Sequence, residues 1–174
     1  INKALPAARS GSFVTFGIEP TKAETGYGYI KKSNESPYRE GCFKVDAFIE
    51  KPNLNDAKKF ISDGDYYWNS GIFLFSAKKL IEVLSTLSPE IIEACGMAVS
   101  KAKLDLDFIR LDEESFAACP SISIDYAVME KSKNIAVVPS DLGWSDIGSW
   151  DAIWKLLEKD HNGNATFGDV ITKY

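Results

Sequence analysis

Two short segments constrain this chain more than any other part of its sequence. Residues 48–52 read Phe-Ile-Glu-Lys-Pro, so an alternating apolar strand ends on a carboxylate and an ammonium group, Glu50 and Lys51. Residues 68–73 read Trp-Asn-Ser-Gly-Ile-Phe, a polar corner that leads into an apolar strand. A charged pair and a hydrogen-bonding corner on rigid β elements suit a ligand with an anionic group and hydroxyls, such as a sugar phosphate.

Length and charge narrow the classes of function. The 174 residues fit one domain or a large part of one. The net charge is -5, with 20 basic and 25 acidic residues and no basic run, so we expect no nucleic-acid partner and no anionic membrane. The sequence has no apolar run of membrane-spanning length and opens on no signal peptide, which makes the cytoplasm the expected location.

The cysteines and the histidine do not predict a metal centre. Cys42, Cys95 and Cys119 are odd in number and far apart, and the only histidine is His161. Neither a zinc site nor a disulfide framework is expected from this spacing, and free thiols are the simpler interpretation.

Strand and helix signals alternate along the chain, which predicts an α/β fold with a mostly parallel or mixed sheet. In the expected strand 41–51, the apolar residues at 43, 45, 47 and 49 face one way. Phe48 is the one apolar residue on the opposite, polar side. The run 71–75 is continuously apolar, as in a fully buried strand. The expected strands are 13–18, 25–31, 41–51, 71–75, 135–138 and one starting at 167, and the expected helices are 56–62, 76–87, one opening at 88, 123–131 and 149–159.

Three groups of residues on or beside these strands could bind a ligand. In open α/β sheets ligands lie at the carboxyl ends of strands, where Lys51 could meet a phosphate and Glu50 could accept hydrogen bonds from hydroxyls. Because Gly28 has no side chain, the main chain there can approach a ligand closely. Asn69 offers a donor and an acceptor, and Ser70 a hydroxyl. Each group also has a purely structural interpretation. Glu50 and Lys51 could be an exposed ion pair, Gly28 could belong to an aromatic hairpin strand, and Asn69 and Ser70 could form a turn in which they hydrogen-bond their own backbone.

Asp146 lies between Trp144 and Trp150, just before a predicted helix. A carboxylate there could bind Mg²⁺, which usually takes one or two carboxylates plus phosphate oxygens. The alternative is that Asp146 or Ser149 caps the helix, and for Asp125 a capping role is the favoured interpretation. The sequence shows no convincing pair of nucleophile and base, and phosphoryl or nucleotidyl transfer can proceed without one, by positioning and charge stabilisation.

Five segments in this order resemble the sugar-nucleotide pyrophosphorylases, and most closely the mannose-1-phosphate guanylyltransferases. They are FGIEPTKAETGYGYI at 16–30, FIEKP at 48–52, WNSGIFLF at 68–75, SIDYAVMEKS at 123–132 and GWSDIGSW at 143–150. The resemblance implies a Rossmann-like nucleotide-diphospho-sugar transferase fold with a mixed sheet. It also implies a reaction in which mannose 1-phosphate attacks the α-phosphorus of GTP and yields GDP-mannose and pyrophosphate.

The same resemblance assigns roles to residues. Lys51 would bind the sugar phosphate and Glu50 the sugar hydroxyls, while Asn69 and the Gly28 backbone would contact the sugar. Asp146 would be one of two aspartates that bind Mg²⁺. The implied catalytic groups are Lys51 and Asp146, and the implied substrate-binding set is Glu24, Gly28, Glu50, Lys51, Asn69 and Ser70.

The chain also departs from the family pattern. Ala23 stands where the family commonly has proline, which should affect loop stiffness more than chemistry. The family's N-terminal nucleotide-binding half, with its Gly-rich loop and first metal aspartate, has no counterpart at 1–15. We therefore expect residues 1–161 to be the sugar-phosphate-binding part of the catalytic domain, and we expect this part to be inactive alone. Residues 162–174 would begin a C-terminal extension, which in two-activity members is a phosphomannose isomerase.

Two other functions stay open from the sequence. One is a nucleotidyltransferase for a different sugar 1-phosphate, and the other is a non-catalytic, sugar-phosphate-binding regulatory subunit. The sequence does not fix the oligomeric state, but an exposed edge of a truncated sheet would allow a homo-oligomer.

Overall fold

The computed structural model describes residues 1–35 and 41–173. The chain divides into two compact units, Ile1–Asp141 (unit 1) and Leu142–Tyr174 (unit 2). Within the described residues, no helix has both the length and the apolar character needed to span a bilayer.

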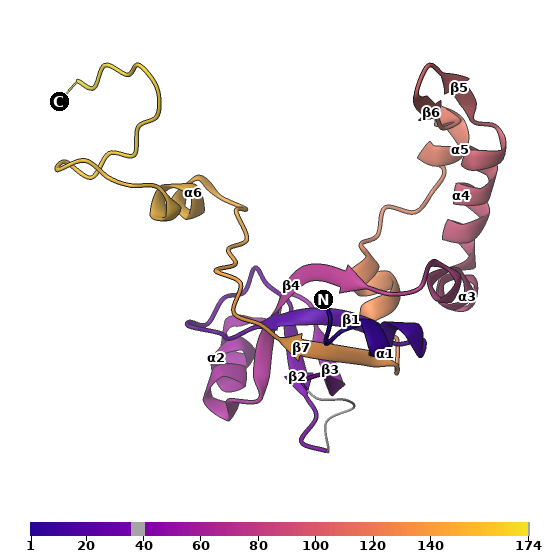
Figure 1. Ribbon diagram of the computed structural model, residues 1–174, viewed down its shortest axis with the longest axis horizontal. Helices are drawn as coiled ribbons and strands as arrows, with labels where there is room; N and C mark the ends of the chain where they lie inside the picture. The colour runs from indigo at the N-terminus through magenta and orange to yellow at the C-terminus, as the bar shows by residue number, and fades with distance from the viewer. Residues whose placement is uncertain (36–40, 174) are drawn as a thin grey trace. The chain divides into compact units, whose positions relative to one another are not determined.

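Unit 1 contains all the strands and most of the helices of the described chain (Figure 1). In chain order its elements are α1 (Leu5–Arg9), β1 (Phe13–Ile18), β2 (Tyr29–Lys32), β3 (Phe43–Ile49), α2 (Leu54–Asp63), β4 (Tyr66–Leu74), α3 (Ala77–Leu87), α4 (Pro89–Ser100), β5 (Lys103–Asp105), β6 (Phe108–Arg110), α5 (Glu113–Ala117), the single π-helical turn η1 (Asp125–Met129) and β7 (Ile135–Pro139). Unit 2 contains α6 (Trp150–Leu156).

Five strands of unit 1 form one sheet in the order β1-β4-β2-β3-β7, and β7 also pairs with β1, so the sheet closes on itself. β1 and β7 run parallel, and the other four pairings are antiparallel. This arrangement confirms the expected α/β class with a mixed sheet, whereas a mostly parallel sheet is not what the described strands form. Among the described strands, only the β5–β6 hairpin keeps free edges.

The sheet buries apolar side chains on both faces, as the unbroken apolar runs of β1 and β7 predict. One face carries Val14 and Phe16 and packs against the alanines of α1, which lies beside β1 (Figure 1). The other face carries Phe13 and Val137 and packs against the apolar residues of η1. Because η1 is anchored on this second face, Asp125 lies beside the middle of β4, and Glu130, which follows η1, lies beside the end of β3.

A bulge in β3 explains why Phe48 breaks the predicted alternation. Lys31 of β2 pairs with Ala47 and Lys32 pairs with Val45, so Asp46 is an extra residue in β3. One extra residue reverses the side-chain alternation beyond it. Phe48 therefore joins the same core as Val45, and it is 8% exposed. The sequence-based prediction that residues 43, 45, 47 and 49 share one face was wrong for this reason.

The segment around Asn69 is not a corner before a strand, as predicted, but the interior of a longer one. β4 begins at Tyr66, and its pairing with β1 shifts register between Asn69 and Phe73. Gly71 sits in this irregular stretch with φ +69, a left-handed conformation that favours glycine. The following Ile72 is 46% exposed, so the strand is not buried throughout as the apolar run suggested.

The sequence predicted the boundaries of the helices better than it predicted which side chains cap them. Gly64 ends α2 in the left-handed conformation, as expected, and the Asn53 side chain caps its start by accepting from the Asp56 N–H. Ser76 and Ser88 precede α3 and α4 without a side-chain cap bond to any described backbone group. In the described stretch 167–173 the structure has no strand, contrary to the prediction, and β5, β6 and α5 were not predicted at all.

The β3 bulge leads to a first prediction. In the protein that carries this chain, Phe48→Ala should lower the free energy of unfolding by about 3 kcal/mol, because it leaves a cavity in the core. Asp46→Ala, two positions away but exposed, should change it by less than about 0.5 kcal/mol. Urea denaturation measures both values. Similar losses for the two variants would contradict the inverted alternation.

Candidate functional site

Strand pairing brings the two segments singled out in the sequence to the same place. β2 lies between β3 and β4, so the residues just before β2 meet the end of β3 and the middle of β4. The Lys51 N–H donates to the Tyr27 carbonyl at 3.2 Å, and the Asn69 N–H donates to the Gly28 carbonyl at 2.8 Å. Glu50, which follows β3 directly, is thereby held beside Gly28.

Glu50 and Asn69 pack closely against Gly28. A Cβ atom at this position would lie 2.5 Å from Glu50 Oε2 and 3.1 Å from Asn69 Cβ. It would also lie 3.5 Å from Asn69 Nδ2. The absence of a side chain at Gly28 therefore allows a carboxylate oxygen and an amide nitrogen to approach the same stretch of main chain.

Glu50 and Lys51 form an ion pair in which the two partners differ in exposure. Their charged atoms are 3.7 Å apart, and the side chains are 10% exposed for Glu50 and 58% exposed for Lys51. Lys51 has φ +50, one of two such non-glycine residues in the described chain. A positive φ costs free energy in a residue with a side chain, and such strain is often found at functional sites. The ammonium group remains accessible to a phosphate.

The environment of Glu50 disfavours its ionised form. Burial raises the pKa of the Glu50 carboxyl above its ordinary value, and the nearby Asp125 and Glu130 carboxylates raise it further, while Lys51 lowers it. Glu130 also accepts a hydrogen bond from the Glu50 N–H at 2.9 Å. A partly desolvated carboxylate of this kind is well suited to accept hydrogen bonds from ligand hydroxyls.

Asn69 is the centre of a buried hydrogen-bond network. Its Oδ1 accepts from the Thr15 hydroxyl at 3.0 Å and from the Gly71 N–H at 3.2 Å. Its Nδ2 donates to Asp125 Oδ1 at 3.0 Å. Asp125 is thus a partner of Asn69 and not the helix cap that the sequence favoured. Asn69 is 9% exposed and Thr15 is fully buried.

A family model described as nucleotidyl transferase matches residues 1–163. This chain belongs to the nucleotidyl transferase family. It is 51% identical to a mannose-1-phosphate guanylyltransferase of Salmonella montevideo over 99% of its own length. The chain spans 37% of the length of that relative.

Two solved structures share the fold of this nucleotidyl transferase chain. A mannose-6-phosphate isomerase from Helicobacter pylori matches with a TM-score of 0.74 and 36% identity, covering 83% of this chain and 56% of that one. A protein described as a mannose-1-phosphate geranyltransferase from Thermus thermophilus matches with a TM-score of 0.74 and 34% identity, covering 91% of this chain and 44% of that one.

Two other predicted site residues, Ser70 and Glu24, form their contacts mainly with residues close to them in the sequence. Ser70 Oγ accepts from the Ile72 N–H at 3.3 Å, which is the self-bonded arrangement considered from the sequence. Glu24 pairs with Lys22 at 2.8 Å and accepts from the Thr25 N–H at 3.1 Å, and the Lys22 contact chiefly holds the pKa of Glu24 below its ordinary value. The predicted roles of both residues in substrate binding stay predictions.

Asp146 belongs to unit 2, whereas the other predicted site residues belong to unit 1. The Ser149 hydroxyl caps α6 by accepting from the Ala152 N–H at 3.2 Å, so Asp146 is not the cap. Asp146 is exposed. In the described parts of the chain, no three or more acidic, cysteine or histidine side chains gather as a metal-ligand set. One exposed carboxylate still fits Mg²⁺, which takes most of its ligands from phosphates and water.

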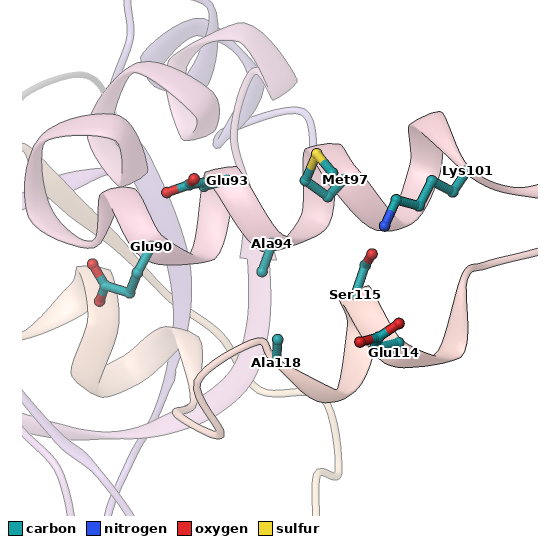
Figure 2. A pocket seen from close by; sticks show the side chains of 8 residues that line it. All are labelled: Glu90, Glu93, Ala94, Met97, Lys101, Glu114, Ser115 and Ala118. Atoms are coloured by element: carbon teal, nitrogen blue, oxygen red, sulfur yellow. The ribbon is translucent and has the colours of Figure 1, made fainter.

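A pocket of about 400 Å³ lies elsewhere in unit 1, between α4 and α5 (Figure 2). Glutamates 90, 93 and 114 line it together with Lys101, as the labelled side chains show. None of the predicted site residues lines this pocket. This pocket and the polar cluster around Gly28 are thus different places in unit 1.

Sequence reasoning missed three residues of the site. Thr15 lies inside an apolar strand, where a lone threonine gives little signal. Asp125 was noticed but interpreted as a cap, and Glu130 was quoted only within the resemblance. The usable signal was the carboxylate at each end of a short, otherwise apolar segment, Asp125 to Glu130.

The raised pKa of Glu50 predicts a pH-dependent stability difference. For a raised carboxyl pKa, the stabilising contribution is complete below the unfolded-state value of about 4.3 and is lost as the pH rises through the folded-state value. Glu50→Gln should therefore have a higher free energy of unfolding in urea than wild type at pH 7. This difference between the two proteins should disappear near pH 4. Glu158→Gln, at an exposed position, serves as the control. An equal difference at both pH values would contradict the burial of an ionisable Glu50.

Proposed function

We propose that the protein carrying this chain is a mannose-1-phosphate guanylyltransferase, and that unit 1 binds the sugar phosphate. The observation that supports this is the cluster of polar groups beside Gly28, where a carboxylate oxygen of Glu50 and the amide nitrogen of Asn69 lie close together and the exposed ammonium group of Lys51 is next to Glu50. An anion site beside a hydroxyl-binding site matches the two ends of a hexose 1-phosphate.

The reaction forms one phosphorus–oxygen bond and breaks another. A phosphate oxygen of mannose 1-phosphate attacks the α-phosphorus of GTP, and the bond from that phosphorus to the bridging oxygen of the β-phosphate breaks. Pyrophosphate leaves with the electron pair of that bond, and GDP-mannose forms. In this proposal Lys51 holds the attacking phosphate, and Glu50 orients the sugar by accepting from its hydroxyls, so that the contribution of unit 1 is positioning.

The choice of mannose and guanine comes from the relatives. The names of the Salmonella relative and the two solved structures all contain a mannose phosphate, and the first is a guanylyltransferase. A panel of mannose, glucose and N-acetylglucosamine 1-phosphates with GTP, ATP and UTP tests the proposal in the whole protein. We expect product only, or at least tenfold faster, from mannose 1-phosphate and GTP. Binding of the sugar phosphate without turnover of any nucleotide would favour the regulatory subunit.

Lys51 gives the first prediction on activity. Lys51→Gln should raise the KM for mannose 1-phosphate by roughly 10- to 100-fold, because it removes a charge-assisted contact to the phosphate. The KM for GTP should change by less than threefold. Lys58→Gln removes an exposed lysine charge from α2 and should leave both constants unchanged. Equal increases for the two substrates in steady-state kinetics would count against the assigned role.

Asp146 is proposed as a magnesium ligand. Mg²⁺ bound there would neutralise phosphate charge, and the Asp146 carboxylate would hold the ion at the reacting phosphates. Asp146→Asn should lower kcat at least tenfold and weaken Mn²⁺ binding measured by electron paramagnetic resonance. Asp141→Asn removes an exposed carboxylate nearby in the sequence and serves as the control. Normal turnover and normal Mn²⁺ binding in Asp146→Asn would show that Asp146 is only a surface carboxylate and does not bind the metal.

A further inference from the structure

The side-chain amide of Asn69 can adopt only one orientation in its network. The Gly71 N–H on its oxygen side is a donor that cannot accept, and the Asp125 carboxylate on its nitrogen side is an acceptor that, when ionised, cannot donate. Rotating the amide by half a turn would place nitrogen against an N–H group and oxygen against a carboxylate. Both contacts would become repulsive in a buried setting, where unpaired polar groups cost most.

The fixed orientation determines what Asn69 can offer a ligand. Its oxygen already accepts from Thr15 and Gly71, so both lone pairs are in use. Its nitrogen has two hydrogens, and one is donated to Asp125. Among the described residues the structure shows no acceptor for the other, and the nitrogen lies in the same small region beside Gly28 as Glu50 Oε2. The sequence suggested that Asn69 offers both a donor and an acceptor, but the structure leaves only a donor.

We propose that Asp125, assisted by Thr15, is a positioning residue that locks the Asn69 amide so that the site takes a hydroxyl which accepts from Asn69 and donates to Glu50. This inference rests on the proposed function, since the hydroxyl belongs to the sugar. Asp125 acts through Asn69 and does not touch the sugar.

The position of η1 supports this role. Its residues Ala127, Val128 and Met129 are buried in the core that also contains Phe13 of the sheet, which anchors the turn. Its first residue, Asp125, accepts from Asn69, and the residue after its end, Glu130, accepts from the Glu50 N–H. One turn of π-helix, a conformation often found at functional sites, thus contacts both residues that lie beside Gly28.

A double-mutant cycle in the whole protein tests the proposal. Asp125→Ala should raise the KM for mannose 1-phosphate about tenfold and leave the KM for GTP within twofold. Asp125→Asn keeps an acceptor for Asn69 Nδ2, so its KM should stay within about threefold of wild type. In an Asn69→Ala background, Asp125→Ala should have no further effect, because the group on which it acts is gone.

Two further variants separate positioning from a general effect on charge or folding. Asp63→Asn removes an exposed carboxylate charge from the end of α2 without touching Asn69, so it should not reproduce the tenfold change. Thr15→Val replaces a buried hydroxyl by a methyl group and should raise the same KM in the same direction, by less. An Asp125→Ala effect that persists undiminished in the Asn69→Ala background would overturn the proposal, as would no effect at all.

A measurement that needs no substrate keeps this inference separable from the proposed function. The Gly71 N–H is held by Asn69 Oδ1, so its hydrogen exchange reports the orientation of the amide. Exchange at Gly71 should be faster in Asp125→Ala and near wild type in Asp125→Asn. If wild type does not use mannose 1-phosphate, the proposed function fails while this result still stands. Unchanged exchange in Asp125→Ala would refute the positioning role.

Discussion

The site depends on the backbone hydrogen bonds that β2 and the residues before it make on both sides. The Asn69 N–H donates to the Gly28 carbonyl, and the Lys51 N–H donates to the Tyr27 carbonyl. These two bonds bring together segments that are far apart in the sequence. The close approach of the Glu50 and Asn69 side chains to Gly28, and the place of the ion pair beside them, follow from this pairing.

The same geometry carries an electrostatic cost. Glu50 is almost buried and has Asp125 and Glu130 as neighbours, so three carboxylates share a small region and the pKa of Glu50 is raised. The cost is offset by Lys51, by the Asn69 amide bond to Asp125, and by the Glu50 N–H bond to Glu130. A cluster of polar groups that costs stability in this way is typical of binding sites.

Sequence patterns predicted the elements whose signals are local. The buried strands β1 and β7 were found almost to the residue, because a continuous apolar run bounded by polar residues is a local feature. Phe48 was assigned to the wrong face, because a one-residue bulge arises only when β3 pairs with β2. The Asn69 segment was predicted as a polar corner before a strand, since its Asn-Ser-Gly composition favours turns and its strand partners β1 and β2 are distant in sequence.

The sequence by itself determined which chemical groups the candidate site contains: Gly28, Glu50, Lys51 and Asn69 were all predicted from motifs and from the resemblance they carry, and the structure brings them together. Only the tertiary structure decided how those groups behave. It gave Asp125 to Asn69 instead of a helix end, turned the Asn69 amide into a donor, and raised the pKa of Glu50. The physical reason is that hydrogen-bond orientation and desolvation depend on neighbours in space, and here those neighbours come from separate segments of the chain.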